Sequence, residues 1–272
     1  MTDAQRWPVA KMGLVAFVVL VLLFLVVPTM VIVPLSFSGE EFMKFPPESL
    51  SLKWYEAFFG SKDFMTSVLN SLKIGIPAAS LATVNGTLAA LALARGKIRF
   101  RRALSALIIA PLILPQIVLA LGLFPVLAKI GLIGGYIGIV LAHAVVTMPL
   151  AFITVSTSLS SYPESLETAA QTLGANRWRT FVHVTYPLIR PGITLGFIFS
   201  FAFSFDELIL SIFLTSPATR TVPRMLWEQL NFEVTPVIAA ATCCILAGTL
   251  LLLVVGALVQ QRSRVVIGVE AT

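Results

Sequence analysis

The sequence is poor in charged residues and in the groupings that build catalytic and metal sites. Only 12% of its 272 residues are charged, about half the share of an ordinary soluble domain. No histidine, cysteine and acidic residues have metal-ligand spacing, and no serine, histidine and aspartate are placed for nucleophilic catalysis. A Gly-x-x-x-x-Gly-Lys-Ser/Thr run is also missing. We therefore expect no catalytic residue, no metal site and no phosphate loop for ATP, which argues against an intramembrane hydrolase.

Cysteine and histidine are scarce as well. Cys243 and Cys244 are adjacent inside an apolar run, and this spacing allows neither a useful disulfide nor a metal site. The pair therefore carries no information about the redox compartment. His143 and His183 are isolated from each other, and we expect His143 to be a hydrogen-bonded contact between helices rather than a proton relay.

Long apolar runs take the place of charge. Of all residues, 57% are hydrophobic, and the mean hydropathy is +0.94, so we expect a membrane-embedded chain. Six runs are long enough to cross a bilayer. The first is too long for a cleaved signal peptide, and no small-x-small cleavage site follows it. Prolines interrupt the third run, which is tolerated where neighbouring helices or a cavity satisfy the freed carbonyls. The predicted spans are 13–33, 66–94, 104–127, 136–157, 192–214 and 236–260.

Positive charge is unevenly distributed between the two sides of this arrangement. The predicted inner segments hold 12 of the 19 cations, five of them in the tight loop from Arg95 to Arg102. Because cytoplasmic loops carry an excess of lysine and arginine, we expect both termini and residues 158–191 to be cytoplasmic. A basic loop this short between two spans argues against nucleic-acid binding. The outer segments hold seven cations and seven acids, and the acids are Glu40, Glu41, Glu48, Glu56, Asp63, Glu228 and Glu233.

Residues 158–191 form a polar stretch between two apolar runs. Pro163 followed by acidic residues predicts a helix start, because proline suits the first turn and acids suit the positive end of the helix dipole. Gly174 stands where this helix should end. A second short helix, from Arg177 to Val184, is predicted to stop at Pro187. The expected structure is a helix, a glycine turn and a helix beside the membrane.

This stretch resembles the loop of permease subunits of binding-protein-dependent ABC importers. That family carries Glu-Ala-Ala, three residues, Gly, nine residues, Ile, one residue and Leu-Pro. The spacing is kept here when counted from Gly174, although Thr168 stands at the Glu position and Tyr186 at the Leu position. The resemblance implies a coupling helix that sits in a groove of a cytoplasmic ATPase subunit. The residues it assigns to ATPase coupling are Glu167, Thr168, Ala169, Ala170, Gly174, Ala175, Val184 and Pro187.

Two acids, Asp206 and Glu207, follow Phe205 within the fifth apolar run. Charged groups inside a span cost a few kcal/mol each unless they are paired or hydrated. One interpretation is a structural role, in ion pairs or near the membrane interface. The other is a lining of the substrate path, formed by Phe205, Asp206 and Glu207, that attracts a cationic substrate near an outer gate. Trp227 is a further candidate, either for a cation–π contact with substrate or as an interfacial anchor.

The residues around this acidic pair resemble the permeases of spermidine/putrescine importers. In that group an acidic pair lies in the fifth span, and Leu-Pro or Val-Pro precedes a short helix, as Val222 and Pro223 do here. Asn70, Ser71 and Leu72 at the head of the second span also resemble that group. The resemblance implies transport of polyamines or a related amine, while related permeases handle amino acids and opines.

The resemblance also implies the fold, the partners and the location. The fold is all-α, a type I ABC importer permease with six transmembrane helices in a bacterial inner membrane. The partners are a second permease subunit, two ATPase subunits that bind ATP and Mg²⁺, an external substrate-binding protein and membrane lipid. The expected parts are residues 1–63 (first span and external segment), 64–260 (permease core) and 261–272 (cytoplasmic tail).

Two other classes remain open at this point. A secondary carrier or channel would need no ATPase, but it usually shows an internal repeat or more spans, and we see no repeat. A membrane scaffold subunit would have no translocation path of its own. An ATPase subunit retained in mild detergent would separate the importer from both.

Overall fold

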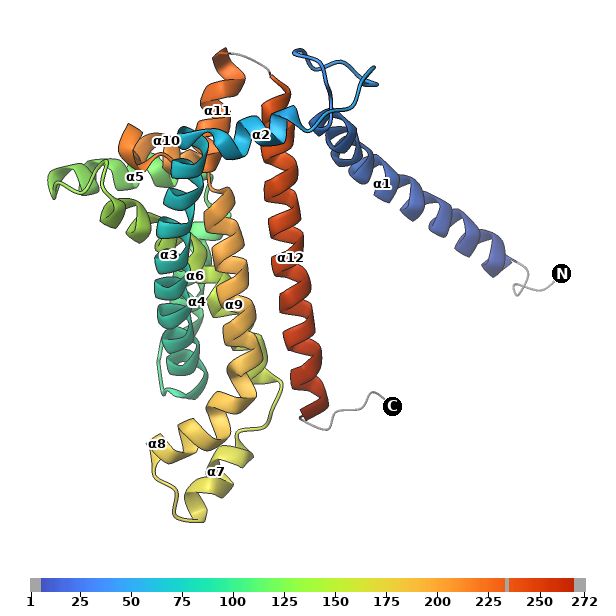
Figure 1. The fold of residues 1–272 in the computed structure, drawn as a ribbon. Helices are drawn as coiled ribbons and strands as arrows, with labels where there is room; N and C mark the ends of the chain where they lie inside the picture. Colours follow the sequence, from blue (N-terminus) through green and yellow to red (C-terminus); the bar gives the residue numbers. More distant parts are fainter. Residues whose placement is uncertain (1–5, 233–234, 267–272) are drawn as a thin grey trace. The chain divides into compact units, whose positions relative to one another are not determined.

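The computed structural model describes residues 6–232 and 235–266, and over these ranges it is helical apart from loops and two isolated β-bridges. It divides into two compact units, residues 1–62 with 229–247 and residues 63–228 with 248–272. The three parts expected from the sequence remain a prediction, and Glu233 and residues 267–272 lie outside the described residues. The longest helices are α1 (Arg6–Ser36), α3 (Lys62–Arg95), α6 (Tyr136–Ser160), α9 (Tyr186–Asp206) and α12 (Pro236–Val266) (Figure 1).

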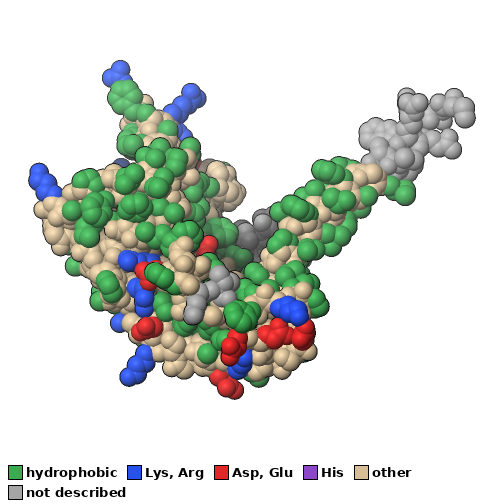
Figure 2. All heavy atoms as spheres, turned by 90° about the horizontal axis from the view of Figure 1, so that it is seen from above, with side chains coloured by type: hydrophobic (Ala, Val, Ile, Leu, Met, Phe, Trp, Pro, Cys, Tyr) green, Lys and Arg blue, Asp and Glu red, His purple; other side chains and the backbone are tan. Residues whose placement is uncertain are grey.

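Helix α1 is the most apolar helix of the first unit. The most apolar 18-residue window within Lys11–Ser36 has a mean hydropathy of 3.1, and no residue of that window is buried within the chain. Hydrophobic side chains cover the visible face of α1 (Figure 2). A helix that is apolar all round is stable in a hydrocarbon environment rather than in water. This agrees with the predicted first span.

The segment after α1 has a folded structure of its own. Backbone hydrogen bonds join Gly39 N to Ser49 O at 2.8 Å and Ser51 N to Phe37 O at 2.7 Å. The hydroxyl groups of Ser36 and Tyr55 lie 2.7 Å apart, which ties the end of α1 to α2 (Lys53–Gly60). This segment of mixed polar and aromatic residues is therefore a hydrogen-bonded connection between α1 and α2 rather than a further span.

In the second unit, α6 packs along α9 through small residues. A Cβ atom on Gly196 would lie 2.8 Å from Thr154 Oγ1 and 3.0 Å from Ala151 Cα, so only glycine allows this approach. Higher along the pair, Ser200 Oγ donates to Thr147 O at 3.2 Å. His143 Nδ1 lies 2.7 Å from Ser204 Oγ, which confirms the expected interhelical contact. Small residues at four-residue spacing on α9 thus build a close polar and apolar seam of the kind common in membranes.

The predicted third span is broken in the structure. It consists of α4 (Arg101–Ile113) and α5 (Gln116–Lys129), which are bent by 103° relative to each other. The residue before a proline avoids the helical conformation, and Leu114 before Pro115 is extended, with φ −69° and ψ 140°. The interruption that the prolines of this run predict is therefore present, as a sharp bend between two helices. Among the described residues, five helices are long and apolar enough to span, or six if α4 and α5 form one span.

The second helix of the polar loop does not stop at Pro187 as predicted. Helix α8 (Arg177–Thr180) runs through the π-helical turn η2 (Phe181–Thr185) directly into α9. Pro187 lies at the start of α9, directly after this wider turn. Proline removes a backbone donor and its ring crowds the preceding turn, and a π turn locally relaxes the hydrogen-bond ladder. The structure therefore carries one continuous helix from the loop into the span Arg177–Asp206.

The same helix ends earlier than predicted at its other end. We expected the fifth span to cover 192–214, but α9 ends at Asp206 and the short helix α10 (Ile209–Leu214) follows. Glu207 between them is extended, with φ −72° and ψ 109°. The turn η3 (Pro217–Thr219) then leads to α11 (Val222–Phe232), the short helix expected after Val222 and Pro223.

Candidate functional site: the α7–α8 loop and the α10–α11 hairpin

The polar loop begins with α7 (Ser165–Thr172), and its glycine turn is a Schellman motif. Gly174 has a φ of +92°. Gly174 N donates to Gln171 O at 3.0 Å, and Ala175 N donates to Ala170 O at 3.0 Å. These two bonds satisfy carbonyls that the helix end leaves free. The Ala-Ala-x-x-x-Gly spacing therefore has a physical origin, since it places glycine at the one position that needs a left-handed conformation.

Helix α8 begins three residues after this glycine, at Arg177. Asn176 is its N-cap, and the side-chain oxygen of Asn176 accepts a hydrogen bond from Arg179 N at 2.8 Å. Capping of this kind satisfies one of the free donors at a helix start. A turn closed by Gly174 and a start fixed by Asn176 hold α7 and α8 at a defined angle at one end of α9 (Figure 1).

An ion pair ties α7 to the end of α3. Arg95 Nε lies 3.2 Å from both carboxylate oxygens of Glu167, and Tyr162 OH donates to Glu167 Oε1 at 2.8 Å. The Arg95 guanidinium also lies 5.2 Å from the centre of the Tyr162 ring. Burial raises the pKa of Tyr162, and its hydrogen bond to Glu167 acts in the same direction. We call Arg95, Tyr162 and Glu167 the loop clamp.

The loop clamp rests on a hydrophobic cluster, while the tip of the loop is uncovered. The cluster joins α3, α6 and α9 and includes Leu93, Leu159 and Ile189. At the tip, Leu173 is 89% exposed and Trp178 is 70% exposed. Apolar side chains of this size on an exposed polar loop are typical of a surface that a partner covers.

The predicted coupling residues are all brought together on this loop, but they differ in exposure. The carboxylate of Glu167 binds Arg95 within the loop clamp, so this acid makes an intramolecular contact. Five residues of the site were not among the predicted ones: Leu173, Trp178, Arg95, Tyr162 and Asn176. Leu173 and Trp178 could have been found from the sequence, because each is a large apolar side chain within a polar stretch. The exposed predicted residues are Thr168, Ala169, Gly174 and Pro187, and the partly buried ones are Glu167, Ala170, Ala175 and Val184.

The acidic pair at the other end of α9 splits into two environments. Glu207 is 3% exposed, and its Oε1 accepts a hydrogen bond from Leu210 N at 2.9 Å, at the start of α10. Asp206 is exposed at the last residue of α9. The carboxylate of Glu207 therefore caps a helix, which is the geometry of the structural interpretation. Asp206 alone of the pair presents its charge outward.

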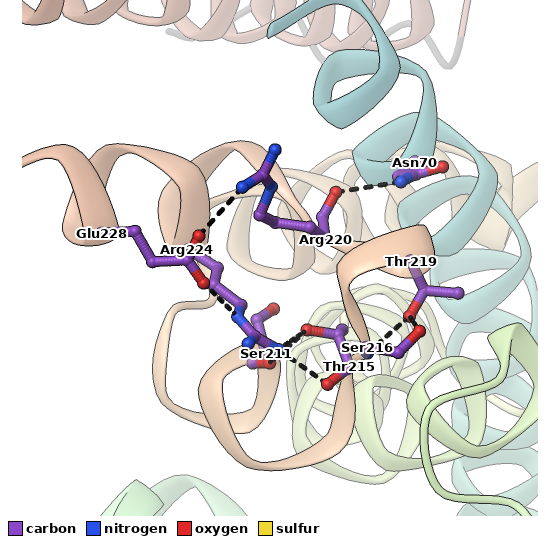
Figure 3. Close-up of polar contacts among 8 residues, drawn as sticks. All are labelled: Asn70, Ser211, Thr215, Ser216, Thr219, Arg220, Arg224 and Glu228. Carbon is purple, nitrogen blue, oxygen red and sulfur yellow. Dashed lines mark hydrogen bonds and ion pairs between the residues drawn. The ribbon is translucent and has the colours of Figure 1, made fainter. Parts of the chain in front are cut away.

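The hairpin formed by α10, η3 and α11 is held by a cluster of charged and hydroxyl groups (Figure 3). Arg224 Nη1 donates to Thr215 O and to Thr215 Oγ1, each at 2.6 Å, at the carbonyl end of α10. A cation at this position is favoured by the helix dipole. Glu228 joins Arg224 Nε at 2.8 Å and Arg220 Nη1 at 3.1 Å. Burial acts to raise the pKa of Glu228, but the hydrogen bonds from Arg224 and Arg220 outweigh it, so this pKa is lowered.

Asn70 and Ser71 on α3 complete this cluster, which we call the outer cluster. Asn70 Nδ2 donates to Ala218 O and Arg220 O, each at 3.0 Å, and Tyr136 OH donates to Asn70 Oδ1 at 2.6 Å. Ser71 Oγ accepts from Val222 N at 2.9 Å, at the start of α11. The residues that resembled one group of permeases in sequence therefore fasten the hairpin to α3.

The remaining two candidates lie on different elements. Phe205 on α9 has its ring centre 5.8 Å from that of Phe201. Trp227 on α11 is 48% exposed. No group of three or more histidine, cysteine or acidic side chains that could hold a metal ion occurs in the part of the chain that the structure describes.

The fold and these two regions define a polytopic α-helical membrane protein with a polar helix–turn–helix at one end of a bundle. Residues 75–265 match the family described as binding-protein-dependent transport system inner membrane component, and the chain belongs to that family. It is therefore an inner membrane component of an ABC importer, a transport subunit rather than an enzyme.

Two named permeases and one solved structure are similar to this chain. It is 28% identical over 225 residues to the spermidine/putrescine transport system permease protein PotC of Haemophilus influenzae, covering 83% of this chain and 87% of that protein. It is 30% identical over 224 residues to the putrescine transport system permease protein PotI of Escherichia coli K12, covering 80% and 79%. A chain of a bacterial alginate ABC transporter, solved with an alginate pentasaccharide-bound periplasmic protein, aligns with a TM-score of 0.72 at 17% identity, covering 98% and 97%. This last match confirms the fold.

Proposed function

We propose that this chain forms one half of the translocation path of an importer for polyamines such as spermidine or putrescine. The loop with its exposed Leu173 and Trp178 carries the importer assignment, because it offers a surface for the ATPase subunit. The names of the relatives support the substrate class. An exposed carboxylate at the end of α9, Asp206, suits a cationic substrate, since opposite charges attract strongly where water is scarce.

The proposed mechanism uses the two connections that leave the loop. ATP and Mg²⁺ are held by the partner ATPase, and closure of an ATPase dimer moves the docked loop. The loop clamp passes this motion from α7 to α3, and the unbroken helix from α8 passes it to α9. Packed helices respond by switching between two arrangements rather than by continuous bending. Substrate shifts the balance only through different affinities for the inward-facing and outward-facing states.

The full assembly in this proposal contains a second permease subunit, two ATPase subunits and an external substrate-binding protein. The loop and both termini face the cytoplasm, as the distribution of cations supports. A cysteine introduced at Ala175, which is partly exposed at the loop tip, should react with an impermeant reagent only after the membrane is opened. Labelling in intact spheroplasts would contradict this orientation.

Uptake and co-purification together test the proposed function. Cells that express the complete importer should accumulate radiolabelled spermidine or putrescine, and an excess of unlabelled polyamine should compete while amino acids should not. The Trp178→Ala variant should lose the ATPase subunit during purification in mild detergent, because it removes the largest exposed apolar side chain of α8. Competition by amino acids alone would refute the substrate class. Uptake driven by an ion gradient without the ATPase would refute the importer.

A further inference from the structure

The short loop between α3 and α4 and the first turn of α4 contain four basic side chains that have no acidic partner among the described residues. Arg95 is occupied by the loop clamp, but Lys97, Arg99, Arg101 and Arg102 form no ion pair with any described residue. All four are exposed. Unpaired cations so close together repel one another, so an anion that joins them is stabilised.

A hollow marks the end of this loop. It has a volume of about 600 Å³ and is lined by Arg101, Arg102 and Ser105. Ser105 lies four residues after Arg101 and three after Arg102 on α4, so its side chain is a neighbour of both arginines on the helix surface. Two guanidinium groups and a hydroxyl group are the donors that recognise phosphate oxygens, with arginine binding two oxygens at once. The first turn of α4 has no acidic residue, and its N-cap, Phe100, makes no side-chain hydrogen bond, which leaves the local field positive.

The same helix face becomes apolar immediately beyond the hollow. Ile108, Ile109 and Leu112 follow Ser105 at helical spacing. Ile108 and Ile109 are partly buried against the hydrophobic cluster of α3, α6 and α9, and Leu112 is exposed. Leu107 on a neighbouring face is exposed too, and Phe100 beside the arginines is 69% exposed. A cationic hollow beside apolar side chains of the same helix matches a molecule with an anionic head and hydrocarbon chains. Free phosphate matches only the first part.

We infer that this hollow binds the headgroup of an anionic phospholipid, with an acyl chain along Ile108, Ile109 and Leu112. The inference is independent of the transported substrate. Basic pockets at the ends of membrane helices bind such headgroups through the same combination of charge and interfacial position. Bound lipid would hold the start of α4, the first half of the broken span, at the headgroup layer.

Native mass spectrometry of the complete importer tests this site. The complex is extracted from membranes that contain phosphatidylglycerol and cardiolipin. Arg101→Gln with Arg102→Gln should reduce the bound anionic lipid by about tenfold, because each basic residue near an anionic surface contributes several-fold to binding. Lys97→Gln with Arg99→Gln is the matched control, since it removes the same charge from the adjacent loop but spares the hollow. The control should retain most of the lipid.

The outcomes are distinguishable. Equal lipid loss in both double variants would show a diffuse charge effect and overturn the site. Unchanged lipid in the first variant would also overturn it. Stabilisation of the complex by inorganic phosphate in phosphatidylcholine nanodiscs, to the same extent as by phosphatidylglycerol, would replace the lipid with a free anion and refute the acyl-chain contact. If the first double variant does not assemble, Arg101→Gln against Lys97→Gln gives the same comparison.

Discussion

The two ends of α9 are built in opposite ways. At the outer cluster, side chains of the chain itself hold the hairpin through hydrogen bonds and ion pairs of 2.6 to 3.1 Å, made by Arg224, Glu228 and Asn70. At the loop, one clamp holds α7, while Leu173 and Trp178 remain uncovered. Buried polar groups that are paired make a region rigid, although Arg220 Nε and Thr221 Oγ1 in this cluster are buried without a hydrogen-bond partner among the described residues. Uncovered apolar groups gain free energy only when a partner arrives. One end is therefore held mainly from within the chain, and the other is the end where we propose that a partner subunit binds.

The largest effect should follow from a change at the loop turn. A residue with a Cβ atom in the left-handed conformation of Gly174 is strained by about 1–2 kcal/mol, and each 1.4 kcal/mol changes a population about tenfold. Gly174→Val should therefore lower uptake by about tenfold while the protein still inserts. Uptake and substrate-stimulated ATPase activity measure this. Because no atom lies within 4 Å of the added Cβ, the effect comes from backbone strain. Normal activity would refute the role of the turn.

A smaller effect should follow when the loop clamp is broken. Glu167→Gln removes the charge that holds Arg95 and keeps the size of the side chain, and a pair of this kind contributes about 1 kcal/mol. Uptake should fall by roughly fivefold, since 1 kcal/mol corresponds to that factor. Hydrogen exchange in α7 should increase at the same time. Glu164→Gln is the control, because Glu164 is exposed on the same loop. Equal effects of both changes would exclude the clamp as a link.

Neutral replacements of Asp206 and Glu207, at the other end of α9, should have two different effects. Asp206→Asn should lower polyamine uptake severalfold with the complex intact, because Asp206 is exposed and its charge faces outward. Glu207→Gln should instead reduce assembly or thermal stability, because the Glu207 carboxylate is buried against the start of α10. Uptake per assembled complex separates the two. A Glu207→Gln complex that assembles normally but does not transport would place Glu207 on the path instead.

The smallest effect should be the pH dependence of the outer cluster. The folded protein lowers the pKa of Glu228 below its ordinary value of 4.5. Its contribution to stability is therefore complete above pH 4.5 and is lost as the pH falls through the lowered value. Hydrogen exchange of α10 and of the start of α11 should rise only below about pH 4.5, and Glu228→Gln should remove this step. A step that persists in Glu228→Gln would assign it to another carboxylate.

Sequence alone predicted correctly that the apolar spans exist and where the loop turn lies, because both depend on local chemistry. A long apolar run is unstable in water wherever it lies, and the spacing from Ala170 to Gly174 closes a helix end without any other element. The same reasoning predicted the interruption near Pro115, but it misplaced the end of the fifth span and wrongly ended a helix at Pro187. Pro115 broke a helix, whereas Pro187 did not, since the π turn before Pro187 relaxes the backbone there. The presence of a proline alone therefore does not show whether the helix breaks at that position.

The partner of each polar side chain was decided by the tertiary structure alone. Glu167 meets Arg95, which lies 72 positions earlier, and Asn70 meets Arg220, which lies 150 positions later. Such pairs exist only after α3, α6 and α9 have packed, and no local pattern encodes them. The same packing buries Glu207 and exposes Asp206 although they are neighbours in sequence. The sequence thus determined which segments enter the membrane, because the transfer of apolar surface out of water is a property of each segment. The fold decided which charged side chains form contacts within the chain and which remain available to partners, because those contacts join residues that are distant in sequence.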